Sequence, residues 1–197
     1  MVPNINPVVL LFASIFTSNI LLANFLGMCS FISISKDMKS ASGLGLAVTV
    51  VLTITAMLNW ALLQYVLIPL DLLYLRYIIF IIVIAATVQI LEMVIDRVSP
   101  ALYMSLGIFL PLITVNCAIL GVALFMQIRN YSFVQTVVYA FGSGLGWWLA
   151  IITLAAIQKK LVKAPTPAGL KGPGITLITI GFMAMAFIGF SGMLSVQ

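Results

Sequence analysis

Cysteine is the residue type in this chain that binds soft metals most strongly, and it occurs at only two positions. Cys29 and Cys117 both lie inside long uncharged stretches, and the chain contains no histidine. Thiolates are ligands of zinc, copper(I) and iron–sulfur clusters. The residues alone leave three interpretations open: two small side chains without chemistry, a disulfide, or ligands of a metal or cluster.

The composition indicates the environment in which these thiols lie. Hydrophobic residues make up 63% of the chain and charged residues 7%, and the mean hydropathy is +1.27. A soluble domain of this composition would have too few polar residues to cover its surface. Apolar runs recur along the whole sequence instead of being confined to an N-terminal signal peptide. We therefore predict an integral membrane protein.

Stretches without charge are long enough to define the membrane spans. A helix needs roughly 20 apolar residues to cross a bilayer. We predict an all-α integral membrane protein, a single transmembrane domain over residues 1–197, with no separate soluble domain. The six predicted transmembrane helices cover residues 8–34, 43–66, 73–95, 101–126, 132–157 and 173–194.

Basic residues gather in alternate loops of this arrangement. Seven of the nine Lys and Arg residues fall in the first, third and fifth loops. Short loops rich in Lys and Arg stay on the cytoplasmic side. We therefore expect both termini on the extracytoplasmic side. The basic loops on the cytoplasmic face of the lipid bilayer account for the net charge of +5. No nucleic-acid partner is needed to explain this charge.

A short internal repeat divides the chain into halves. Residues 42–45 read Ser-Gly-Leu-Gly, and residues 143–146 read the same. Each copy opens the helix that follows a cysteine-bearing helix. Three helices are an odd number, so the second half must enter the membrane inverted. We predict two inverted three-helix repeats, at about 8–96 and 101–194, with the first helix of each repeat broken.

The broken helices follow from the depth of the two cysteines. Straight helices would place Cys29 and Cys117 roughly 18 Å apart along the membrane normal, at 1.5 Å per residue. That separation excludes a disulfide and a shared small cluster. Gly27 precedes Cys29 and Pro111 precedes Cys117, and both residue types interrupt helices. We predict breaks at these positions that bring the cysteines to one depth.

Broken helices leave main-chain groups that hydrocarbon cannot satisfy. Asn24, Thr114 and Asn116 lie near the predicted breaks. We expect their side chains to bond the freed main-chain groups or the groups around the sulfurs.

One acidic residue, Glu92, falls inside a predicted span. An acid in a span is a candidate for an ion pathway, although an interfacial ion pair with Arg97 is the plainer interpretation. No phosphate-binding or dinucleotide-binding motif and no flavin-attachment motif is present. We expect no catalytic residue in this chain, and neither flavin nor NAD bound by it.

Two segments carry a resemblance to a known family. Residues 19–29 (NILLANFLGMC) and 106–118 (LGIFLPLITVNCA) resemble the RnfA component of the Rnf complex and the NqrE component of the sodium-pumping NADH:quinone oxidoreductase (Nqr). The resemblance implies a homologous six-helix membrane protein, of the RnfE or NqrD type, as pseudo-symmetric partner. It implies that Cys29 and Cys117 supply half of the ligands of an intramembrane 2Fe–2S cluster, and that the partner supplies the rest.

The resemblance further implies electron relay across a bacterial cytoplasmic (inner) membrane, coupled to Na⁺ or H⁺ transport, with other subunits carrying flavins and iron–sulfur clusters. The compact loop at 66–76 resembles the Rnf protein, whereas Ser30 and residues 142–148 (GSGLGWW) resemble the Nqr protein. An insertion or deletion weighs more than substitutions, so the prediction is an Rnf-type ferredoxin:NAD⁺ oxidoreductase, with Nqr as alternative. A small secondary transporter or channel with inverted repeats is the competing class.

Overall fold

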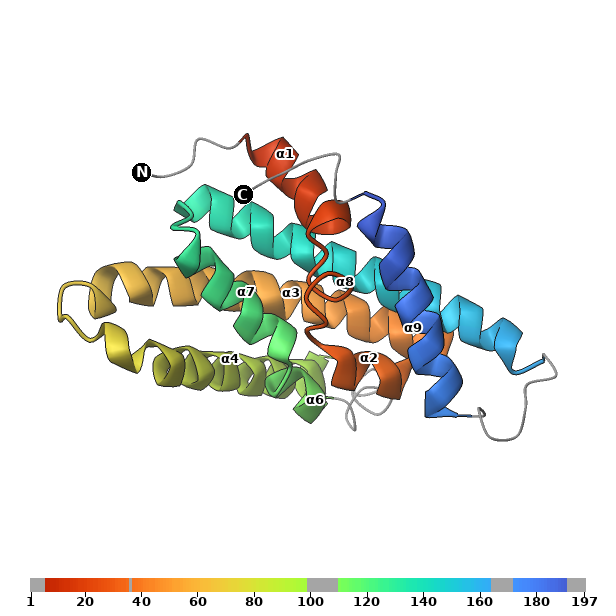
Figure 1. Cartoon of the computed structure of the whole chain (residues 1–197). Helices are drawn as coiled ribbons and strands as arrows, with labels where there is room; N and C mark the ends of the chain where they lie inside the picture. The colour runs from red at the N-terminus through yellow and green to blue at the C-terminus, as the bar shows by residue number, and fades with distance from the viewer. Residues whose placement is uncertain (1–5, 36, 99–109, 164–171, 191–197) are drawn as a thin grey trace.

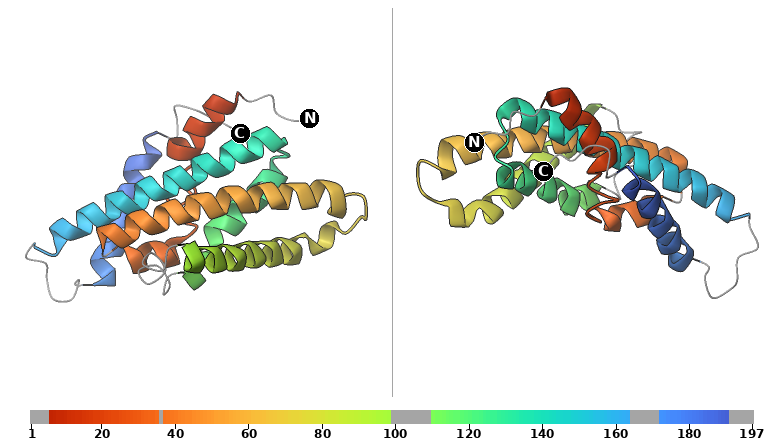
Figure 2. Two further views of the ribbon diagram at one scale, coloured as in Figure 1. Left: turned by 180° about the vertical axis from the view of Figure 1, so that it is seen from behind. Right: turned by 45° about the horizontal axis from the view of Figure 1, so that its top comes forward.

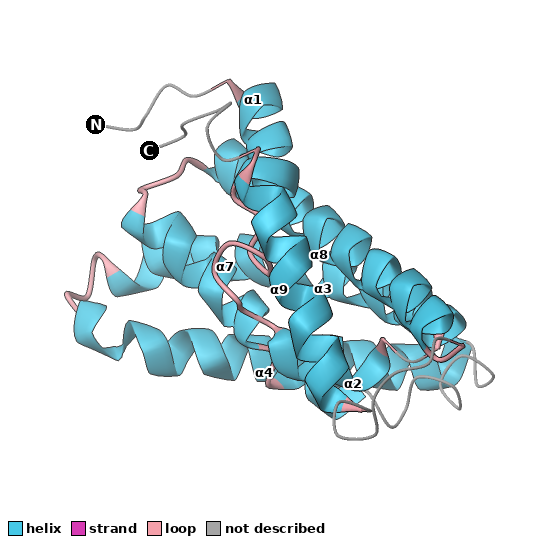
Figure 3. Cartoon of the chain, turned by 45° about the vertical axis from the view of Figure 1, so that its right-hand side comes forward, coloured by secondary structure: helices cyan, strands magenta, loops and turns pink. Residues whose placement is uncertain are grey.

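In the computed structural model, residues 6–35, 37–98, 110–163 and 172–190 are described. Every regular element in these ranges is helical (Figures 1 and 3). The elements in chain order are α1 (Pro7–Phe12) with its π-helical continuation η1 (Ala13–Thr17), α2 (Met28–Ile34), α3 (Met38–Leu62) with its π-helical continuation η2 (Leu63–Leu67), the 3₁₀ turn η3 (Leu73–Leu75), α4 (Arg76–Val98), α6 (Leu110–Thr114), α7 (Cys117–Ile128), α8 (Phe133–Leu161) and α9 (Pro173–Ile188).

Three of the helices are long and apolar enough to cross a bilayer by themselves. They cover Met38–Leu67, Leu73–Val94 and Phe133–Leu161, with mean hydropathies of 2.0, 2.4 and 1.7. Three shorter apolar helices cover Pro7–Thr17, Leu112–Ile128 and Pro173–Ile188. The prediction of an all-helical integral membrane protein is confirmed for the described residues, whereas the six-helix inverted repeat stays a prediction.

Two of the other three predicted spans are not continuous helices, whereas α9 is continuous from Pro173 to Ile188. Residues 18–27 are not helical, so the predicted helix 8–34 consists of two pieces. A second interruption separates α6 from α7 at residues 115–116. Residues 101–109 of the predicted span 101–126 and residues 191–194 of the predicted span 173–194 lie outside the described residues.

Local signals in the sequence explain where the two longest helices begin. Ser132 and Gln135 form a reciprocal capping box at the start of α8, which satisfies two main-chain donors that the helix leaves free. Asp37 caps α3, and its carboxylate accepts hydrogen bonds from the hydroxyl and the main-chain N–H of Ser40, at 2.8 and 3.0 Å. These bonds from Ser40 lower the pKa of Asp37.

Helices α3 and α8 form the most extensive contact between elements of the described structure (Figures 1 and 2). A Cβ atom added to Gly45 would overlap the Trp148 ring, and one added to Gly144 would lie 2.8 Å from the Thr49 side chain. The contact moves forward along α3 as it moves backward along α8, so the helices run antiparallel. The two Ser-Gly-Leu-Gly copies therefore lie at the same crossing, where small residues allow close approach.

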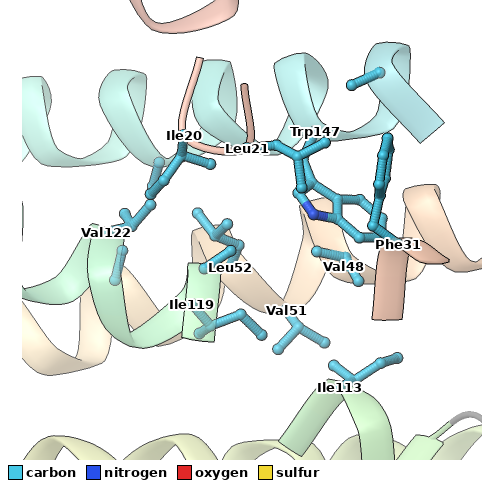
Figure 4. Close-up of a cluster of buried hydrophobic side chains, with 14 of the residues drawn as sticks. Ile20, Leu21, Phe31, Val48, Val51, Leu52, Ile113, Ile119, Val122 and Trp147 are labelled. Atoms are coloured by element: carbon cyan, nitrogen blue, oxygen red, sulfur yellow. The ribbon is translucent and has the colours of Figure 1, made fainter. Parts of the chain in front are cut away.

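A single apolar core joins these helices to the broken ones. Figure 4 shows Trp147 of α8 beside Phe31 of α2, with Ile20 and Leu21 of the non-helical segment close by. The rings of Phe31 and Trp147 pack edge to face, with their centroids 6.4 Å apart. The 18–27 segment is therefore packed into the core on one side.

The glycine crossing generates a stability prediction. We expect Gly144→Ala to lower the free energy of unfolding by about 1–3 kcal/mol, because overpacking forces the neighbouring backbone to move. The added Cβ would lie 2.9 Å from the Cα of Thr49. Thermal or denaturant unfolding of the purified chain in detergent measures the change.

Gly181→Ala in α9 is the matched control, because nothing lies within 4 Å of a Cβ at that position. We expect this variant to be unchanged or up to about 1 kcal/mol more stable. Equal effects of the two substitutions would contradict the packing at the α3–α8 crossing.

Candidate functional site

The first interruption is a ten-residue irregular segment with its own backbone constraints. Phe25 and Gly27 have positive φ angles of 54° and 85°. Gly27 stands in the left-handed region directly before α2. A Cβ at Gly27 would also lie 2.7 Å from Nε1 of Trp147, so both the conformation and the space favour glycine.

Asn19 satisfies the main chain of this first interruption. Its Oδ1 accepts from the N–H groups of Leu21 and Leu22, at 3.1 and 3.3 Å. Its Nδ2 donates to the carbonyls of Ile15 and Gly146, at 3.0 and 2.9 Å. The side chain is 1% exposed. Asn19 therefore also joins the interruption to α8.

Asn24 is exposed and makes no side-chain hydrogen bond within the described part of the chain. Its predicted role at the break stays a prediction. The buried Asn19, five residues earlier, bonds the main-chain groups of the first interruption, because its side chain points into the protein. Asn19 is a polar residue inside an uncharged apolar run. That placement is the one feature of the sequence that could have indicated its role.

The second interruption lies directly before Cys117. Asn116 caps α7, and its Oδ1 accepts from the N–H of Ala118 at 3.0 Å. Thr114 is half-buried and its hydroxyl bonds none of the described residues. Pro111 lies within the described part of α6, four residues before the interruption at 115–116, and its predicted role in breaking the helix stays a prediction.

A hydrogen bond joins the two interruptions. The main-chain N–H of Gly27 donates to Sγ of Cys117 at 2.8 Å. Cys29 follows Gly27 by two residues, which span at most about 7 Å. Both cysteines are free thiols, and both are exposed. The two thiols therefore flank one junction between the broken helices, and they are not separated by the distance that straight helices would impose.

Two further hydrogen bonds between buried side chains stabilise this junction. Ser30 Oγ donates to the carbonyl of Gly27 at 3.1 Å, and Asn116 Nδ2 donates to Ser30 Oγ at 3.3 Å. Ser30 is 0% exposed and Asn116 is 2% exposed. The sequence pointed to Ser30 only through its resemblance to one of the two branches of the family.

The donor set fits part of an iron–sulfur site. Two exposed thiols with one N–H donated to a sulfur match the ligands and the surroundings of such clusters. No group of three or more Cys, His, Asp or Glu residues occurs among the described residues. A 2Fe–2S cluster takes four ligands, and the two cysteines could supply two of them.

Glu92 stands apart from these contacts as a residue without an ion-pair partner. It lies in α4 and is half-buried. No ion pair joins it to Arg97 in the described structure. Its role in an ion pathway stays a prediction.

The fold and the site together describe a helical membrane protein that presents two thiols on interrupted helices. The chain belongs to the family described as "Rnf-Nqr subunit, membrane protein", whose model matches residues 8–194.

Curated relatives of high identity carry the name of one of the two complexes. The chain is 54% identical over 185 residues to the Na⁺-translocating NADH-quinone reductase E subunit of Proteus mirabilis, covering 91% of this chain and 93% of the relative. It is 53% identical over 197 residues to the protein of the same name from Marinobacter nauticus, covering 93% and 96%. These relatives favour the Nqr alternative over the Rnf prediction.

The two asparagines near the first break provide a direct test. We expect Asn19→Ala to lower the free energy of unfolding by at least about 2 kcal/mol, because buried main-chain donors and acceptors lose their partner. Asn24→Ala should change it by less than about 0.5 kcal/mol, as is usual for exposed positions. Unfolding of the two variants in detergent gives the comparison, and a larger loss in Asn24→Ala would refute the assignment.

Proposed function

We propose that this chain is the NqrE component of a Na⁺-translocating NADH:quinone oxidoreductase and holds half of an intramembrane 2Fe–2S cluster. It would thus be one membrane component of a redox-driven ion translocase, without catalysis of its own. The observation that carries the proposal is the junction at which Gly27 meets Cys117 and presents two free thiols. The names of the relatives support the choice of complex.

Cys29 and Cys117 would hold one iron-binding half of the site. When bound, such a cluster supplies one-electron transfer and divides the crossing of a hydrocarbon layer about 30 Å thick into shorter steps. The protein's own contribution is to orient the two sulfurs toward the outside of the chain and to donate the Gly27 N–H to one of them. An N–H donated to a sulfur stabilises negative charge on it.

The exposed face at the junction supports a partner chain. Phe25 is 54% exposed and Val115 is 71% exposed, and both lie in non-helical segments. Non-helical backbone at membrane depth is tolerated only against protein or a water-filled cavity. A homologous six-helix protein, with two thiols on its own broken helices, would cover this face and complete the ligand set.

The inverted repeat belongs to the same proposal. The two Ser-Gly-Leu-Gly copies meet at the antiparallel crossing of α3 and α8, and each cysteine follows an interruption. These features support two halves of opposite orientation, with repeats at about 8–96 and 101–194. The proposed orientation places both termini on the extracytoplasmic side of the bacterial inner membrane, in accord with the basic residues of the loops.

The cysteines decide between this proposal and a transporter without redox chemistry. In the complex purified without air, we expect the wild type to contain iron and labile sulfide and to absorb visible light. Cys29→Ser and Cys117→Ser should each abolish the signal of this cluster, because serine is a poor ligand for a soft metal. Ser33→Ala, on the same helix α2, is the control that should keep it. A stable complex without cluster iron at these cysteines would favour the transporter class.

Substrates separate the two complexes of the family. We expect membranes that contain the complex to reduce quinone with NADH in a Na⁺-stimulated manner, and to lose this activity when the chain is deleted. Complementation with the wild-type chain is the control. Loss of ferredoxin-dependent NAD⁺ reduction instead would overturn the choice of Nqr and support Rnf.

A further inference from the structure

We infer that Ser30 and Asn116 are positioning residues that hold the two thiols at a fixed separation through a closed hydrogen-bond network. The network consists of Gly27, Ser30, Asn116 and Cys117, and is called the cross-break network below. Its relevance to electron transfer rests on the proposed function, whereas its geometry does not.

The cross-break network forms a closed ring between segments that are far apart in sequence. Gly27 N–H donates to Cys117 Sγ at 2.8 Å, and Ser30 Oγ donates to Gly27 O at 3.1 Å. Asn116 Nδ2 donates to Ser30 Oγ at 3.3 Å. The peptide bond between Asn116 and Cys117 closes the ring. Neither interruption can therefore shift alone without breaking a bond of the ring.

The direction of each bond is determined by its neighbours. Asn116 Oδ1 is already engaged by the N–H of Ala118, so its Nδ2 must point toward Ser30. A serine hydroxyl has one proton, which the carbonyl of Gly27 accepts. The remaining lone pairs of Ser30 then accept from Asn116. Each polar atom has a partner, and a fully satisfied buried network rigidifies its surroundings.

Burial makes the cross-break network costly to disturb. Ser30 is 0% exposed and Asn116 is 2% exposed, while the two cysteines beside them are exposed. Trp147, also 0% exposed, lies against Gly27. The network is therefore buried next to the exposed thiols, between them and the core. From this location it can fix the positions of both sulfurs.

A distance measurement tests the inference without any cluster. Cys29 and Cys117 are the only two cysteines of the chain, so spin labels attached to the full-length chain through disulfides report one distance. The labelled Cys117 sulfur keeps its lone pairs as weak acceptors, and the variants change only the bonds of Ser30 and Asn116. We expect one narrow distribution in the wild type and a clearly broader one in Ser30→Ala. Asn116→Ser should broaden it as well, since serine still caps a helix but is too short to reach Ser30.

The double variant distinguishes the loss of a shared network from independent destabilisation of the two segments. Both substitutions remove the bond between Asn116 and Ser30, and Ser30→Ala also removes the bond to the Gly27 carbonyl. The double variant should therefore broaden the distribution no more than Ser30→Ala alone. Ser33→Ala, at an exposed position of α2 with no side-chain bond to the described residues, should leave it narrow. Unchanged widths in both single variants, or additive broadening in the double variant, would overturn the inference.

A second measurement, on the intact complex, distinguishes failure of the proposed function from failure of the inference. We expect Ser30→Ala and Asn116→Ser to release iron to a chelator about tenfold faster than the wild type, the scale of one lost buried hydrogen bond, and to shift the midpoint potential of the cluster. A wild-type complex without a cluster at these cysteines would contradict the proposed function but leave the distance result to decide the inference. A loaded complex whose release rate and potential are unchanged in both variants would contradict the inference alone.

Discussion

The main-chain groups freed where helices stop inside a bilayer are the constraint on which this structure depends. Hydrocarbon offers them no hydrogen bonds, so each interruption requires an internal partner. Asn19 provides four bonds at the first interruption, and Asn116 caps the helix after the second. The bond from Gly27 to Cys117 connects the two. Two exposed cysteines at one place are a consequence of satisfying those groups.

Close helix packing provides the frame for the interruptions. Glycines at the α3–α8 crossing let the two longest helices approach each other, and Gly146 leaves space for the Asn19 side chain, whose Nδ2 would lie 2.9 Å from an added Cβ. The glycine motif therefore serves two contacts at once. It joins α8 to α3 and to the first interruption, which connects the site to the two longest helices of the described structure.

The two complexes of the family are distinguished by an exposed loop and by buried residues. The loop near residues 66–76 is exposed over most of its length, and surface loops tolerate insertions and deletions. Ser30 and Gly144, by contrast, are buried and in contact with other segments, so their identity is constrained by packing. The names of the relatives favour Nqr, the complex that Ser30 and residues 142–148 resemble, over the complex that the loop resembles.

The sequence by itself determined the membrane environment, the helical class, the positions of the cysteines and the need for interruptions near them, because these follow from composition, span length and residue type. Only the tertiary structure decided that the side chain of Asn19 satisfies main-chain groups of the first interruption, and that the second interruption falls at residues 115–116, directly before Cys117. It also decided that Ser30 and Asn116 meet beneath the thiols. The physical reason is that a hydrogen-bond partner depends on where a side chain points after packing, and residues 86 positions apart in the chain give no local sign that they will meet.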